Sequence, residues 1–174
     1  SNPYRFCNGS IADRNQRMRE MTLTLFNGIK PQADRVTLIS RADYLDEITA
    51  LCLFPYTNLS LLQINRELVK MPIEEKMKIL DFYIGKRDSR RDRTGRSFEA
   101  GYPLTFDLVG CFAEYRDLER HRILTQQKQM LSTDLGFIMP QEMAVIGLEK
   151  EIEELVGMMS NLNSDLRHTG LEVA

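Results

Sequence analysis

Residues 116–127 read RDLERHRILTQQ, and they place three arginines and a histidine within seven positions. The arginines are Arg116, Arg120 and Arg122, and His121 is one of the two histidines in the chain. A guanidinium group presents several N–H donors in a fixed plane, which suits phosphate oxygens better than an apolar core. The stretch therefore predicts an anion-binding segment, with a charged surface helix as the simpler alternative.

We expect this stretch to lie on a helix over about 112–129. At about 100° per residue, Arg116 and Arg120 share one face, and Asp117 and His121 share the next. Arg122 lies roughly 200° from Arg120, so one straight helix cannot direct both at one small ion. Three arrangements remain open: one arginine forms a structural ion pair, the helix lies between two ligand groups, or the helix bends or ends there.

The composition is that of an ordinary globular protein. A chain of 174 residues fits a single domain, 1–174, with a substantial core, and this domain is either the whole protein or one half of a longer two-domain protein. The 23 Lys and Arg residues nearly balance 25 Asp and Glu, so any anion site must be local. The three cysteines form no CxxC pair, which argues against a disulfide framework or a zinc site, and no metal is predicted.

Targeting signals are not apparent in the sequence. No apolar run approaches the roughly 18 residues of a membrane span. Free thiols and the lack of a signal peptide indicate a cytoplasmic protein.

Apolar spacing gives the expected elements outside the motif. It predicts helices over about 11–26, 42–53, 60–70 and 72–84, and a β-branched run predicts a strand over 36–39. Around residues 102–109, apolar Tyr102, Leu104, Phe106 and Leu108 alternate with Pro103, Thr105 and Asp107. This period of two predicts a half-buried strand.

Residues 85–96 hold six basic and two acidic residues without periodicity, which predicts a loop. This loop is either a solvated or nucleic-acid-contacting segment or a lid over the anion site. Asp88 and Asp92 interrupt the basic run and no aromatic residue lies within it, so nucleic-acid binding is disfavoured.

The last expected helix spans about 141–166. Its apolar residues alternate spacings of three and four, as in a heptad seam, through Val145, Leu148, Ile152, Leu155, Met159, Leu162 and Leu166. The seam indicates either a long core helix or a helix at a subunit interface.

The run from Arg120 to Thr125 resembles the RHRxxS/T core of the flavin-dependent thymidylate synthases, the ThyX family. Glu99 lies 21 residues before Arg120, as the acid of the family's Ser-x-x-Glu-His segment does, and Thr105-Phe106 lies between them. Residues 90–99 (RRDRTGRSFE) and 134–142 are similar to a divergent ThyX-like branch. The resemblance covers about 85–142.

The resemblance implies an α+β fold in which an antiparallel sheet packs with several long helices. It implies a homotetramer that binds FAD and dUMP at sites shared between subunits. The implied reaction methylates dUMP to dTMP with methylenetetrahydrofolate as the one-carbon donor, and with reduced FAD, regenerated by NADPH, as the hydride source. A uracil nucleotide and a flavin are thus the implied ligands.

The resemblance also implies roles for individual residues. The flavin side would use Arg120, His121, Arg122, Thr125 and Gln127. The substrate side would use Glu99, Asp117, Lys128 and Ser132. Several family residues are replaced on the substrate side, because Lys128 stands for a Glu, Met130 for a Ser, Ser132 for an Arg and Asp117 for a Gln.

Ala100 stands where the family has a flavin-contacting His. The residues that match the flavin-binding half of the family motif nevertheless follow it more closely than those that match the substrate-binding half. A catalytically inactive ThyX-like ligand-binding or structural domain is therefore the main alternative, and a nucleic-acid-binding domain using residues 85–96 is the third.

Overall fold

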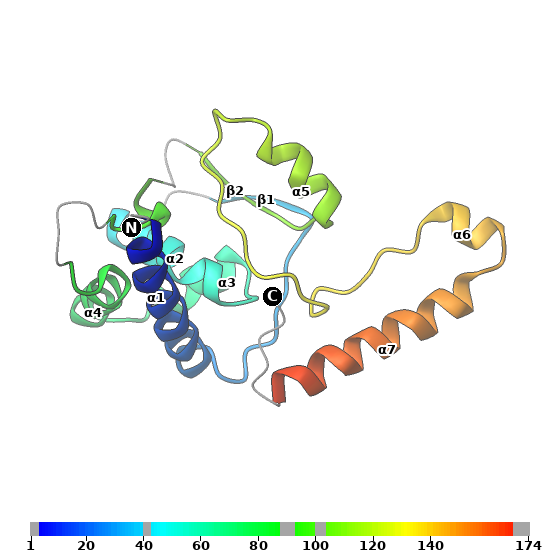
Figure 1. Ribbon diagram of the computed structural model, residues 1–174, viewed down its shortest axis with the longest axis horizontal. Coiled ribbons are helices and arrows are strands. Elements are labelled where there is room, and N and C mark those ends of the chain that lie inside the picture. The colour runs from blue at the N-terminus through cyan, green and yellow to red at the C-terminus, as the bar shows by residue number, and fades with distance from the viewer. Residues whose placement is uncertain (1–3, 40–42, 88–92, 100–103, 169–174) are drawn as a thin grey trace. The chain divides into compact units, whose positions relative to one another are not determined.

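The computed structural model describes residues 4–39, 43–87, 93–99 and 104–168. The chain divides into two compact units, residues 1–130 and residues 131–174. The first unit contains α1 (Tyr4–Leu25), β1 (Val36–Ile39), α2 (Tyr44–Leu53), α3 (Leu61–Leu68), α4 (Ile73–Ile84), β2 (Thr105–Leu108) and α5 (Phe112–Glu119) (Figure 1). Short 3₁₀ helices lie at Phe54–Tyr56 and Arg96–Glu99, and the second unit contains α6 (Gln141–Val145) and α7 (Glu149–His168). The α+β class expected from the sequence is confirmed.

The core of the first unit is built around α2. Its second half is buried almost all round, from Ile48 through Leu53, and this helix contacts both α3 and α4. Helix α4 in turn contacts α1, whose Met18 is fully buried (Figure 1). A helix that is apolar on most of its surface must lie at the centre of a packed unit.

Local signals in the sequence explain where α3 and α4 begin and end. Ser60 and Gln63 form a capping box at the start of α3, in which the Gln63 N–H donates to Ser60 Oγ at 3.4 Å. Pro72 precedes α4, where no N–H is needed, and Gly85 ends that helix with a φ of 63°. Both helices match the spans that apolar spacing predicts.

The sheet has two strands among the described residues, and its buried face is the opposite of the expected one. β1 pairs antiparallel with β2, with Val36 opposite Leu108 and Leu38 opposite Phe106. All four of these side chains are exposed, whereas Asp107 is 7% exposed. The expectation that the apolar positions of residues 102–109 face the core is therefore wrong at the described positions. The cause is a hydrogen bond that holds Asp107 inside.

Three expected helices have different bounds. The first begins at Tyr4 instead of about residue 11, and the motif helix ends at Glu119 instead of about residue 129. The last is broken into α6 and α7 by a turn at Gly147, which has a φ of 78° that most residues avoid. In the basic loop expected over 85–96, residues 85–87 and 93–95 are neither helix nor strand, whereas Arg96 begins a short 3₁₀ helix. Residues 88–92 lie outside the described chain.

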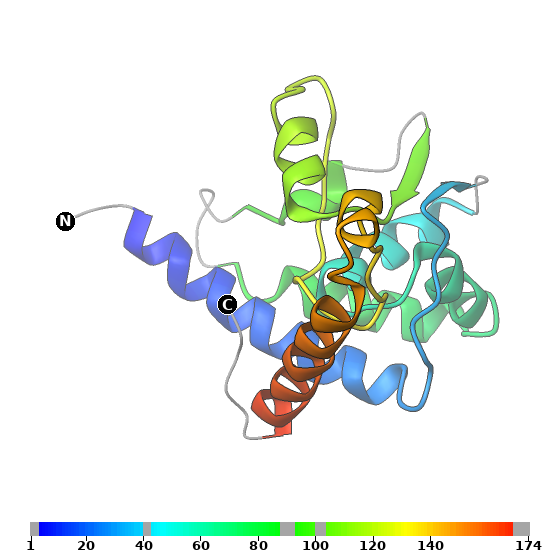
Figure 2. The same ribbon diagram turned by 90° about the vertical axis from the view of Figure 1, so that its right-hand side faces the viewer.

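In the second unit, the segment that precedes α6 contacts α7, which Figure 2 shows as a continuous helix. Asn163 donates to Thr133 Oγ1 at 3.1 Å, and Thr133 Oγ1 lies 3.4 Å from Ser160 Oγ. The seam residues Leu155, Met159 and Leu162 are exposed. The two readings of this seam, as a core helix or as a subunit-interface helix, both stay predictions.

A buried ion pair joins α4 to α2. Lys76 Nζ contacts Asp46 Oδ1, and the two residues are 7% and 8% exposed. Charges removed from water to this degree are stable only as a pair, because the attraction between them offsets the free-energy cost of removing both from water.

We expect Lys76→Ala to lower the free energy of unfolding by about 3–5 kcal/mol, because it leaves the Asp46 carboxylate buried without a partner. Urea unfolding followed by circular dichroism measures this change. Lys78→Ala, on an exposed position of the same helix, is the control and should change stability by less than about 0.5 kcal/mol. Equal effects of the two substitutions would contradict the importance of the pair.

Candidate ligand-binding site

A cavity of about 100 Å³ lies in the first unit, where α2, α3 and β2 meet the chain that follows the arginine motif. Its apolar lining comes from Leu51, Phe54, Leu61, Leu104 and Phe106. Its polar lining comes from Thr105, Asp107, Thr125 and Gln127. An apolar cavity with a few polar groups is the usual form of a small-molecule site. The structure thus brings together two residues that the sequence assigns to cofactor binding, Thr125 and Gln127.

Asp107 is the buried charged group of this cavity. Its Oδ2 accepts a hydrogen bond of 2.7 Å from the backbone N–H of Leu61, the first residue of α3. Burial raises the pKa of the Asp107 carboxyl, and the backbone N–H groups of Leu61 and Leu108 oppose that rise. The carboxylate therefore connects the strand to a helix and also faces the cavity.

The chain after the arginine motif has neither helix nor strand where a helix is expected. Thr125 lines the cavity, Gln127 bonds to the core, and Gln129 donates to the Leu59 carbonyl oxygen at 2.8 Å. The side-chain bonds of Gln127 and Gln129 thus hold this segment against the core in place of a continued helix.

Gln127 is bonded to two backbone segments of the core. With its Oε1 directed at Ser97, the amide accepts from the Ser97 N–H at 2.9 Å and from Ser97 Oγ at 2.8 Å. Its Nε2 then donates to the Leu51 carbonyl oxygen at 3.0 Å. This orientation is the one in which each donor meets an acceptor. The Gln127 amide is therefore occupied within the fold, and its role is to fix the wall of the cavity.

Ser97 belongs to a buried polar cluster behind that wall. Its Oγ lies 2.9 Å from the Tyr83 hydroxyl, and the Arg14 guanidinium lies 4.9 Å from the centre of the Tyr83 ring. Arg14 also donates to the Arg93 carbonyl oxygen at 3.1 Å. Gly95, with a φ of 112°, is required where the chain passes against Tyr83 and Arg14. The cluster holds residues 93–97 against the core.

The buried thiol and phenol near this cluster are poor nucleophiles. Burial raises the pKa of the Cys52 thiol to about 12, against the lowering effects of Ser97 and Arg14. Burial also raises the pKa of Tyr56 to about 12. Both groups stay protonated near neutral pH, so neither supplies an anion for nucleophilic chemistry. Within the described ranges, no group of three or more His, Cys, Asp and Glu residues could hold a metal.

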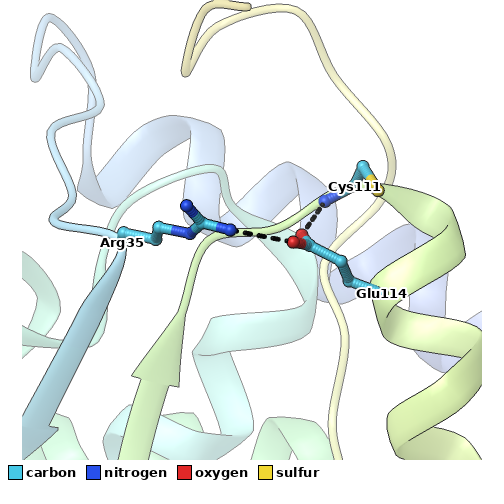
Figure 3. Close-up of polar contacts among 3 residues, drawn as sticks. All are labelled: Arg35, Cys111 and Glu114. Carbon is cyan, nitrogen blue, oxygen red and sulfur yellow. Dashed lines mark hydrogen bonds and ion pairs between the residues drawn. The ribbon is translucent and has the colours of Figure 1, made fainter. Parts of the chain in front are cut away.

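Helix α5, which carries the arginine motif, is fixed at its N-terminus by one carboxylate (Figure 3). Glu114 Oε2 accepts from the Cys111 N–H at 2.9 Å, and its Oε1 accepts from Arg35 at 2.9 Å. The Cys111 N–H and Arg35 lower the pKa of Glu114. Because Arg35 immediately precedes β1, this contact ties the motif helix to the sheet.

The helix ends just before the RHR residues. The Leu118 carbonyl oxygen accepts from the His121 N–H at 3.0 Å and from Gln126 Nε2 at 2.6 Å, which satisfies the helix end. Residues 120–122 therefore form a turn, and of the three open arrangements the structure has the terminating helix. The expected helix over 112–129 is wrong beyond Glu119, because the side chains of Gln127 and Gln129 bond to distant parts of the core instead.

The RHR turn carries exposed donors. Arg120 Nη1 lies 3.9 Å from Asp117 Oδ1, a solvent-exposed and weak pair. His121 and Arg122 are exposed, and no residue in the described ranges forms a hydrogen bond or ion pair with either side chain. Arg122 precedes Thr125 by three residues, a span of at most about 11 Å.

The predicted substrate residues are scattered. Glu99 and Asp117 are exposed, and the exposed Lys128 has its Nζ 4.9 Å from the centre of the Tyr115 ring. Ser132 belongs to the second unit, where its Oγ accepts from the Asp134 N–H at 3.2 Å. Ala100 lies outside the described residues. None of these side chains lines the cavity.

Sequence reasoning did not single out Asp107, Ser97 or Arg14. The available signal for Asp107 was a lone carboxylate between two apolar strand residues, a position where ionised groups are rare unless bonded. Ser97 and Arg14 carry no local signal, because their partners lie far away in sequence.

Comparisons with known proteins identify similar proteins, whose names state no activity. No family model matches the chain, and no solved structure matches it. A UPF0159 protein of Chlamydia pneumoniae is 38% identical over 112 residues, which cover 64% of this chain and 21% of that protein. A UPF0159 protein of Chlamydia muridarum is 40% identical over 115 residues, with the same shares, 64% and 21%.

A UPF0159 protein of Thermoplasma acidophilum is 30% identical over 110 residues, which cover 62% of this chain and 22% of that protein. The chain thus spans about a fifth of the length of the curated relatives it matches. A search of the described helices for a membrane span found none of sufficient length and apolarity.

The raised pKa of Asp107 predicts a pH effect on stability. The folded protein binds this proton more tightly than the unfolded chain does, so the free energy of unfolding falls as pH rises from about 4 through the raised pKa. Asp107→Asn removes this loss, and the stability of the variant relative to wild type should rise with pH. Urea unfolding between pH 4 and 7 measures the difference, with Asp81→Asn as an exposed control. A difference that stays constant with pH would contradict the assignment.

Proposed function

We propose that this chain is part of a flavin-dependent thymidylate synthase-like protein, which binds FAD and dUMP and methylates the nucleotide with a folate one-carbon unit. One observation carries the proposal. The exposed arginine turn at 120–122 leads within three residues to Thr125, which lines a cavity. A turn rich in N–H donors beside a small cavity suits a ligand that combines phosphate with a ring.

The charges around the turn support an anionic ligand. Arg122 has an exposed guanidinium without a carboxylate partner in the described chain. The whole chain has a formal charge of −2, so attraction for phosphate must come from this local group of cations. Within the family resemblance, these residues contact flavin and nucleotide phosphates.

A catalytically inactive ThyX-like ligand-binding domain is the second candidate, and two observations favour it. The Gln127 amide oxygen is bonded to Ser97 and one of its N–H groups to Leu51, so only its second N–H is left for a flavin. Lys128, which replaces a family glutamate, lies over the Tyr115 ring. Ligand binding without methyl transfer is the outcome expected under this candidate.

We further propose a homo-oligomer, a homotetramer by resemblance, in a cytoplasmic setting. The cavity of about 100 Å³ is too small to enclose a dinucleotide, so the remaining contacts would come from other subunits. The described free cysteines, Cys52 and Cys111, accord with a reducing compartment.

We expect Arg122→Ala to weaken FAD binding by about 1.5–3 kcal/mol, because it removes a charged hydrogen bond to phosphate. This corresponds to a rise in Kd of roughly 10- to 150-fold. Flavin fluorescence titration measures Kd, and a second titration with dUMP tests the nucleotide.

Arg66→Ala is the matched control, since Arg66 is an exposed arginine on α3 outside the motif. Its Kd for FAD should equal that of the wild type. An unchanged Kd in Arg122→Ala, or no binding of either ligand by the wild type, would count against the proposed function. Binding of both ligands without dTMP formation would favour the inactive domain.

We expect the purified chain to have a mass in solution that is a multiple of 20.2 kDa, because shared sites require at least two copies. Multi-angle light scattering after gel filtration measures this mass. A value near that of one chain, with FAD and dUMP present, would exclude sites shared between copies of this chain.

A further inference from the structure

The lining of the cavity narrows the kind of group that it accepts. Leu51, Phe54 and Leu61 provide apolar surfaces for a flat ring, Asp107 provides a carboxylate and Thr125 provides a hydroxyl group. The Thr105 hydroxyl is used within the fold, where it donates to Glu47 Oε1 at 3.4 Å. A carboxylate that is ionised only accepts hydrogen bonds, whereas a hydroxyl can donate one. The matching ligand edge therefore has an N–H donor beside an acceptor.

The volume of the cavity limits the ligand to one ring. One buried water needs roughly 10–15 Å³ of cavity volume. If each non-hydrogen atom of a ligand needs about as much, a cavity of about 100 Å³ holds roughly seven to ten of them. This number is that of a single six-membered ring with its substituents. A whole nucleotide or a three-ring flavin is larger, so only one end of such a ligand enters.

The Asp107 carboxylate retains capacity for a ligand. A carboxylate has about four lone-pair sites, and the backbone N–H groups of Leu61 and Leu108 use two of them. These backbone bonds also fix the position of the carboxylate, because Leu61 begins α3 and Leu108 ends β2. The acceptor is thus held rigidly at the cavity before any ligand arrives.

We propose that Asp107 recognises a cyclic imide, a ring in which one N–H lies between two carbonyl groups, by accepting the hydrogen bond of that N–H. The inference rests on the proposed function, because a uracil base and the pyrimidine part of a flavin both contain this imide. The hydroxyl of Thr125 donates to one of the flanking carbonyls. Asp107 is then the residue that determines which ring is bound, while the arginine turn holds the phosphate.

The test combines a change in the protein with a change in the ligand. Calorimetric titration of the full chain compares dUMP with N3-methyl-dUMP, and FAD with its N3-methyl analogue, since methylation removes the imide N–H. In the wild type and in the control Asp81→Asn, methylation of the ring that enters should raise Kd by about tenfold or more. In Asp107→Asn, which keeps an oxygen for Leu61 but has lost the charged acceptor, methylation should change Kd little. The ligand that shows this dependence identifies the bound ring.

The outcomes separate this inference from the proposed function. Suppose that Arg122→Ala weakens binding of FAD or dUMP, but that methylation changes Kd equally in the wild type and in Asp107→Asn. The imide contact is then excluded and the proposed function stands. If the wild type binds neither dUMP nor FAD, both fail.

If Asp107→Asn does not fold, the comparison is made in the wild type over a range of pH. Protonation of Asp107 removes the negative charge of the acceptor, so the effect of methylation should shrink as pH falls from 7 toward 4. A constant effect over that range overturns the inference.

Discussion

The hydrogen bond from the Leu61 N–H to the Asp107 carboxylate is the contact on which the arrangement of the first unit depends. It joins the start of α3 to β2 across 46 residues of sequence. It also decides which face of β2 is buried, since a carboxylate satisfied inside the unit keeps Thr105 and Asp107 inward and turns Phe106 outward. A polar bond thus overrides the apolar pattern of the strand and creates the polar wall of the cavity.

A second polar connection is made by Gln127, which also lines the cavity. Its side-chain amide bonds to the backbone of Leu51 and Ser97. Because Ser97 also contacts Tyr83, the segment after the arginine turn is joined to α2 and α4. The exposed turn is therefore attached to the core within five residues of Arg122.

Apolar spacing and capping residues predict the helices that build the core, because those signals are local. Leu61, Ile64 and Leu68 lie on one buried face of α3, and Ser60 marks its start. The end of α5 was not predictable, because it depends on distant partners of Gln127 and Gln129. For the same reason the arginine motif indicated an anion site, whereas its neighbour Asp107 came to light only from the contact with Leu61. The break before α7 did have a local signal, Gly147, which the regular seam on both sides obscured.

The uncovered side of the β1–β2 ribbon has a consequence for handling the protein. Val36, Leu38, Phe106 and Leu108 form an apolar stripe, and neither outer edge of the ribbon has a further strand among the described residues. Unpaired edges beside apolar side chains are templates on which other extended chains add. At high concentration, aggregation of the isolated chain would start at this ribbon. Leu38→Lys would oppose that aggregation by placing a charge on the apolar stripe.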